Sequence, residues 1–205
     1  MEFTTWIPLA AICLMGAISP GPSLALIIRN TVQGGRLHGV ATGLGHGVGV
    51  GVYALITALG LALLITRTPW LFQAIQYGGA LFLAWLGLKA LLDNASSQLE
   101  AETTHAPKGQ RGALEGLAVS FLNPQLAIFF VALFSQFVHQ DTGWREGILM
   151  MLTAGGIDAL WYSLVALLLS HGPVLAQLKL RARLIDKLSG LILLGLVQAL
   201  READL

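Results

Sequence analysis

Five apolar segments of this chain are each long enough to cross a lipid bilayer, which leaves few soluble folds open to it. They cover residues 6–28, 39–65, 70–92, 116–138 and 147–170. A sixth, at residues 184–200, is shorter and begins near Asp186 and Lys187, so it would need a locally thinned bilayer. Only 11% of the residues are charged, against about 25% in a soluble domain. We therefore expect an all-α, polytopic membrane protein with six transmembrane helices.

The composition argues against several functional classes. The net charge is +1 and the basic residues are dispersed, so we expect no binding to nucleic acid. Cys13 is the single cysteine, which excludes a disulfide frame and a cysteine-rich metal site. No Walker A loop, HExxH motif or GxSxG motif is present. We expect no metal, no cofactor and no enzyme activity.

The first apolar segment resembles a signal peptide in length, and the two have to be distinguished. A signal peptide begins with a basic region, whereas this segment follows Glu2 and stays apolar as far as Ile28. We interpret it as a retained transmembrane span.

Lys and Arg divide unequally between the two sides that these spans would have. Nine of the twelve fall on one side and three on the other. The positive-inside rule then places the polar stretch 93–115 in the cytoplasm and both termini outside. Trp6, Trp70 and Trp144 fall at the outer ends of three spans, where an aromatic belt is expected.

The polar stretch divides the chain into two groups of three spans, which must have opposite orientations. We expect a first three-helix repeat at 1–92, a cytoplasmic linker at 93–115 and a second repeat at 116–205. "PSLALII" from Pro22 is similar to "PQLAIFF" from Pro124, at matching places in the two groups. Chance similarity is the alternative, because Leu and Ala are common here. A true repeat predicts two inverted halves, as in many secondary transporters.

Two of these apolar segments contain helix breakers. "AISPGPSLALII" places Pro20, Gly21 and Pro22 inside the first span, followed by Ser23. "FLNPQLAIFF" contains Asn123 and Pro124, a good N-cap and a good first helical residue, followed by Gln125. A helix that restarts inside the membrane directs N–H groups and a positive dipole end towards an anionic group. The alternative is a proline kink that only bends each span.

Asp158 and His46 are candidates for coupling to protons. Among the eleven acidic residues, only Asp158 lies well inside a predicted span. An intramembrane carboxylate faces a cavity, finds a partner or takes up a proton, although a structural hydrogen bond between helices is also open. An imidazole in general titrates near neutrality, so His46 is suited to relay protons or to contact a carboxylate. A simple hydrogen bond to a neighbouring helix is the alternative.

Glycines surround His46 at regular spacing. Gly39, Gly43, Gly47 and Gly51 recur every four residues, and Gly45 and Gly49 do so on another face. Small residues at this spacing let helices approach closely in lipid, which predicts that the second span is a central packing element. The same faces make a homodimer possible.

Taken together, these segments resemble the LysE/RhtB family of bacterial amino-acid exporters over nearly the whole chain. The resemblance rests on "SPGPSLALIIRNTVQGGRLHGVATGLGHGVGVGVYALITALGLAL", on "SFLNPQLAIFF" and on "IDALWYSLVALL". It implies export of amino acids or related small metabolites, driven by the proton motive force, across the cytoplasmic (inner) membrane of a bacterium.

The chain departs from the family pattern at two places. The family usually has lysine after Asn-Pro, where this chain has Gln125, and a Pro-Gln-Phe where it reads "SQF" at residues 135–137. Loss of the lysine removes a positive charge near the expected site and leaves the substrate's charge open.

These observations give one functional hypothesis with stated alternatives. The two breaks, at Pro20–Ser23 and Asn123–Gln125, would bind the substrate's carboxylate. Asp158 would attract the substrate's amine or exchange the proton, with His46 as a relay. The expected partners are a small-molecule amino acid, protons and the lipid bilayer. The alternatives are export of a cation or toxic metabolite, a membrane-embedded hydrolase using Ser23 or Ser120 with His46, and a non-transporting membrane scaffold.

Overall fold

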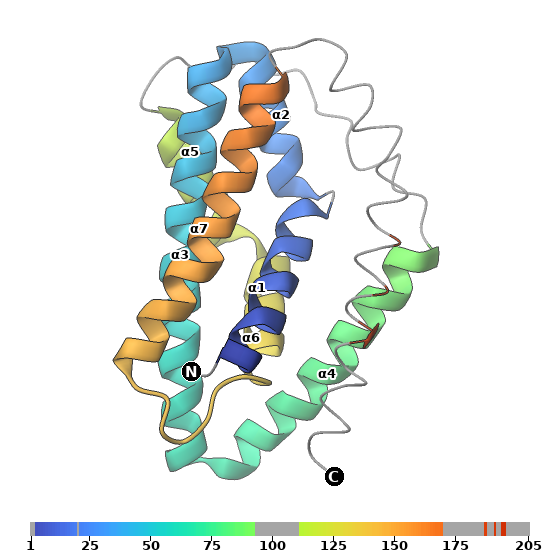
Figure 1. Ribbon diagram of the computed structural model, residues 1–205, viewed down its shortest axis with the longest axis vertical. Coiled ribbons are helices and arrows are strands. Elements are labelled where there is room, and N and C mark those ends of the chain that lie inside the picture. Colours follow the sequence, from blue (N-terminus) through green and yellow to red (C-terminus); the bar gives the residue numbers. More distant parts are fainter. Residues whose placement is uncertain are drawn as a thin grey trace.

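The computed structural model describes residues 3–19, 21–92 and 111–169, together with residues 187, 191, 194 and 195. Within this part the chain forms helices only, as predicted (Figure 1). The helices are α1 (Phe3–Ile18), α2 (Pro22–Gly34), α3 (Arg36–Arg67), α4 (Pro69–Leu92), α5 (Arg111–Leu122), α6 (Pro124–Phe134) and α7 (Trp144–Leu169). Pro20, nearly all of the predicted sixth span and most of the predicted linker lie outside the described residues.

Two helices, α3 and α7, are individually long and apolar enough to cross a membrane. Two bent pairs also qualify: α1 with α2, bent by 55°, and α5 with α6, bent by 62°. The described residues therefore contain up to four spans by length and composition. α4 is one continuous 24-residue helix over the predicted third span. The breaks predicted at the two proline motifs are confirmed, whereas six spans remain a prediction.

Many large apolar side chains are exposed, while several polar ones are buried beside an apolar core. Leu160 of α7, for example, is 74% exposed, while Asp158 on the same helix is 6% exposed. A bilayer explains both, because lipid solvates apolar side chains and leaves polar groups to find partners inside the protein. The fold is consistent with the predicted membrane protein.

The helices alternate in direction, and this defines two ends of the molecule (Figure 1). α3 runs antiparallel to α2 and α7 and parallel to α5, as the glycine contacts along it show. Arg36 begins α3 and Arg67 ends it, so we name the two ends after them. The Arg36 end also carries Arg29 and the start of α5, and the Arg67 end also carries Arg145 at the start of α7. In the predicted topology, the Arg36 end is cytoplasmic.

α3 lies at the centre of the bundle because its glycines admit two neighbours. An added Cβ at Gly43, Gly47 or Gly51 would meet α7, and one at Gly45 or Gly49 would meet α5. The predicted central packing role of this segment is therefore confirmed. Both glycine faces are covered within the chain, so they no longer support a homodimer, which stays an untested prediction.

Replacing Gly47 by alanine should lower the stability of the protein, because the new Cβ would lie 2.7 Å from the carbonyl oxygen of Gly155. Backbone on the facing helix cannot move aside cheaply, and overpacking of this kind costs about 1–3 kcal/mol. Gly60→Ala is the matched control, since nothing lies within 4 Å of a Cβ built there. Thermal unfolding in detergent measures both variants. Equal midpoints for the two would contradict the close packing of α3 on α7.

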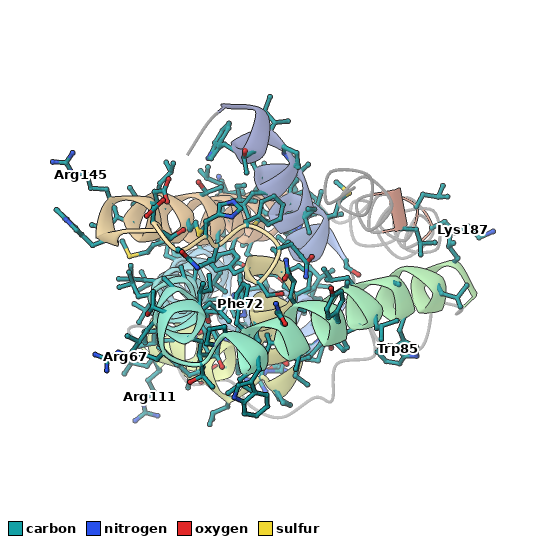
Figure 2. The ribbon with its side chains drawn as sticks, turned by 90° about the horizontal axis from the view of Figure 1, so that it is seen from below. Arg67, Phe72, Trp85, Arg111, Arg145 and Lys187 are labelled. Carbon is teal, nitrogen blue, oxygen red and sulfur yellow. The ribbon has the colours of Figure 1, made fainter. Side chains whose placement is uncertain are left out.

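The Arg67 half of the bundle is filled by one large apolar cluster. Its buried members come mainly from α1, α3, α4, α6 and α7, and they include Leu9, Val50, Phe130 and Met150. α4 starts against this cluster with Phe72 directed inwards and then leans away from the bundle, where Trp85 points outwards (Figure 2). The Arg67 half is therefore packed mainly with apolar side chains.

Candidate functional site

Asp158 and His46 form a buried pair where α7 crosses α3. The distance from His46 Nδ1 to Asp158 Oδ2 is 2.7 Å, and the side chains of His46 and Asp158 are 0% and 8% exposed, respectively. The adjacent Gly47 and Gly155 allow the two helices to come this close. At this distance the bond has the length of a charge-assisted hydrogen bond, which offsets the cost of an intramembrane carboxylate. The predicted contact between His46 and a carboxylate is confirmed.

The break in the first span supplies a third member of this site. Pro22 begins α2 after an extended Gly21, and Ser23 is the next residue. Ser23 Oγ lies 2.9 Å from His46 Nε2. The three side chains thus form a continuous hydrogen-bonded line from α2 through α3 to α7, which we call the central polar chain.

Tyr162 encloses the imidazole of this chain from one side. It follows Asp158 by one turn of α7, and its ring lies edge-on to the His46 ring, with 5.2 Å between centroids and an interplanar angle of 85°. Tyr162 is itself 3% exposed. Tyr162 was not among the site residues predicted from the sequence.

The second break is formed as predicted but stands apart from the central polar chain. Asn123 Oδ1 accepts a hydrogen bond of 3.0 Å from the backbone N–H of Gln125, which confirms Asn123 as the N-cap of α6, with Pro124 as its first residue. Pro124 and Gln125 are exposed. This cap occupies one of the N–H groups that were expected to face a substrate.

The two breaks lie at different levels along α3. Ser23 contacts His46, whereas Phe121, two residues before Asn123, packs on Tyr53 with 6.1 Å between ring centroids. Seven residues of helix separate His46 from Tyr53, a rise of roughly 10 Å. In this conformation, the residues predicted as one substrate site therefore form two separate places.

A cavity of about 360 Å³ lies beside the second break, between α3, α4, α5 and α6. Tyr53, Thr57 and Phe121 contribute to its wall, and the remaining lining is apolar. It has room for a small side chain, but it offers no charged group to a carboxylate or an ammonium ion.

A second polar group, at the Arg36 end, was missed by sequence reasoning. Asn30 of α2 donates to Thr42 Oγ1 of α3 at 3.0 Å and to Glu115 Oε2 of α5 at 2.8 Å. Arg29 pairs with the same carboxylate oxygen at 3.3 Å. Glu115 was assigned to the polar linker, although α5 already begins at Arg111. Asn30 within the run "LALIIRNTV" was the signal that could have been followed.

The hydrogen bond between His46 and Ser23 changes direction when His46 binds a proton. With the Nδ1 proton directed at Asp158, a neutral His46 accepts a hydrogen bond from the Ser23 hydroxyl at Nε2. A protonated His46 carries a proton on both nitrogens, so Nε2 donates to Ser23 instead. Proton binding at the pair thereby reverses a bond to the first residues of α2.

The same order of serine, histidine and aspartate occurs in the catalytic triads of hydrolases. Ser23, rather than Ser120, is the serine that contacts His46, since the Ser120 hydroxyl donates to the Leu117 carbonyl. Among the described residues, no group of His, Cys, Asp and Glu side chains is arranged to hold a metal ion. Geometry alone leaves a nucleophile and a proton relay as alternatives.

The known proteins similar to this chain include threonine efflux proteins and an uncharacterized membrane protein. The family model described as LysE type translocator matches residues 14–201. The chain is 29% identical to the threonine efflux protein of Escherichia coli (strain K12) over 195 residues, 93% of this chain and 94% of that protein. It is 30% identical to the threonine efflux protein of Salmonella typhi over 191 residues, 91% and 92% of the two chains. An uncharacterized membrane protein of Vibrio cholerae serotype O1 is 25% identical over 198 residues, 95% of each. No solved structure matches.

Proposed function

The chain belongs to the LysE type translocator family, and from this premise we propose that it exports threonine or a closely related small amino acid in exchange for protons. It is a translocator and not a hydrolase, so the central polar chain serves movement of a solute rather than bond cleavage. The observation that carries the proposal is the continuous line from Ser23 through His46 to Asp158. This line joins a proton-binding pair to the broken helix.

The substrate's two charges match groups on either side of His46. An amino acid presents a carboxylate, which suits the N-terminal end of α2 at Gly21, Pro22 and Ser23. Its ammonium group suits the Asp158 carboxylate once the His46 contact is released. Binding of the substrate and binding of the proton then compete for one aspartate, which is a direct way to couple export to proton entry.

The second break belongs to another stage of the same cycle in this proposal. Asn123, Pro124 and Gln125 lie roughly 10 Å nearer the Arg67 end than the central polar chain. α1–α2 and α5–α6 run in opposite directions, and so do α3 and α7, which supports two inverted halves (Figure 1). Movement of one half against the other would bring the solute from the first break to the second. The Arg36 end is the cytoplasmic side in this account.

Expression of the protein should raise threonine release from bacterial cells that lack their own threonine exporter. Cells are loaded with a threonine-containing dipeptide, and external threonine is followed with and without a protonophore. We expect release several-fold above the empty-vector level, and we expect the protonophore to remove the difference. The other amino acids are screened in the same way. Release equal to the empty-vector level for every amino acid would refute the proposal.

A further inference from the structure

Four side chains join three helices at the Arg36 end, and we call them the Arg36-end cluster: Arg29, Asn30, Thr42 and Glu115. Asn30 is the centre of the cluster. Its Nδ2 donates to Thr42 and Glu115, and its Oδ1 accepts from Arg29 Nε at 3.2 Å. Asn30 and Thr42 are both 0% exposed, whereas the Arg29 and Glu115 side chains are 28% and 27% exposed. The cluster is therefore buried on one side and reaches solvent on the other.

The cluster connects parts of the chain that are far apart in sequence. Arg29 and Asn30 belong to α2, the helix that follows the first break. Glu115 belongs to α5, the helix that precedes the second break. In the sequence, Arg29 and Asn30 lie 86 and 85 positions before Glu115, respectively. The cluster is thus a direct polar link between the two broken helix pairs, made at one end of the bundle.

The inward face of α3 shows that this end leads to the central polar chain. From the Arg36 end to the His46–Asp158 pair, every fourth residue on this face is buried and polar: His38, Thr42 and His46. Beyond His46 the same face continues as Val50, Ala54, Ala58 and Leu61, all buried and apolar. One turn of helix separates Thr42 from His46, so the Arg36-end cluster is the polar layer next to the pair.

The two closures of the bundle differ in what it costs to open them. Separating α2 from α5 at the Arg36 end exposes groups that water can solvate, with each hydrogen bond exchanged for a bond to water. Opening the Arg67 half exposes apolar side chains of the large cluster, which water does not solvate favourably. The polar end is the one from which a solute reaches His46 and Asp158 with the smaller rearrangement.

We infer that the Arg36-end cluster is the gate on the cytoplasmic side, which separates to admit the solute to the central polar chain. The inference rests on the proposed function for the identity of the solute, but not for the position of the gate. Arg29 and Glu115 act here as positioning residues that hold the entrance shut. Asn30 holds both in register and links them to α3.

Access of a thiol reagent to Ser23→Cys tests the gate without any transport measurement. Cys13 is the single cysteine, so Cys13→Ser provides a background in which the new thiol is the one that reacts. A membrane-impermeant reagent is applied to membrane vesicles of each orientation. Leu37→Cys, at a position 83% exposed at the Arg36 end, identifies the face that the reagent reaches.

Arg29→Gln and Glu115→Gln should each raise the labelling rate of Ser23→Cys at least tenfold from the Arg36 face, with little change from the Arg67 face. Arg36→Gln is the matched control, since it removes an exposed arginine from the same end. The exchange Arg29→Glu with Glu115→Arg should return the rate towards that of the parent. Equal rates in Arg29→Gln and Arg36→Gln would overturn the inference. So would faster labelling from both faces, because the cluster would then hold the whole fold rather than one entrance. The labelling result does not depend on threonine export, so failure of the proposed function would leave it unchanged.

Discussion

Replacing Asp158 by asparagine is expected to abolish export while leaving the protein in the membrane. Asparagine has the size of aspartate and can keep a hydrogen bond to His46 Nδ1, which is now 2.7 Å from Oδ2. It carries no negative charge and binds no proton, so it can neither hold the substrate's ammonium group nor release it on protonation. We expect the initial rate of threonine efflux, per amount of protein in the membrane, to fall at least 100-fold.

Asp141→Asn is the matched control for this variant. Asp141 lies in the exposed loop between α6 and α7, and its replacement by asparagine removes the same negative charge from the chain. Its efflux should equal that of the parent. Undiminished efflux from Asp158→Asn would exclude Asp158 from the mechanism, whatever its role in packing.

Replacing His46 should have the second largest effect on efflux. Asparagine and glutamine at this position test its contacts with Asp158 and Ser23 one at a time. Asparagine places an amide near Nδ1 and can keep the bond to Asp158, whereas glutamine reaches the position of Nε2 and can keep the bond to Ser23. Neither amide titrates near neutrality. Because the proposed exchange requires the ring to carry a proton between its two partners, we expect both variants to lose at least tenfold in efflux driven by the proton gradient.

His139→Gln is the control for the histidine variants, since His139 lies in the loop after α6. Its efflux and its dependence on external pH should match those of the parent. A parental rate and pH profile in both His46→Asn and His46→Gln would show that the imidazole only fills space between α2 and α7.

The sequence predicted the helices and their interruptions well because the physical signals are local. Proline, glycine and an asparagine cap act within one or two turns, so the breaks at Pro22 and Asn123 could be located from the chain alone. Regular glycine spacing likewise predicted the central place of α3, because a face without side chains has to be covered. The structure then identified the partners as α7 and α5.

The site was predicted in part, and the remainder depended on contacts between distant segments. Asp158 and His46 were conspicuous as titratable groups in apolar segments, but no local pattern shows that Ser23 reaches the far side of the imidazole. Glu115 looked like part of a solvated linker because charge suggests exposure, whereas Asn30 draws it into the bundle. Gln125, expected to bear on substrate charge, is exposed, and its backbone N–H bonds to Asn123.

Proton movement driven by threonine in liposomes tests the central claim most directly. The purified protein is reconstituted with a pH-sensitive dye inside, the membrane potential is clamped with potassium and valinomycin, and threonine is added outside. Entry of threonine through a proton exchanger should make the interior alkaline, at a rate that follows uptake of labelled threonine, and Asp158→Asn should show neither signal. Uptake of labelled threonine with no change in internal pH would contradict the account.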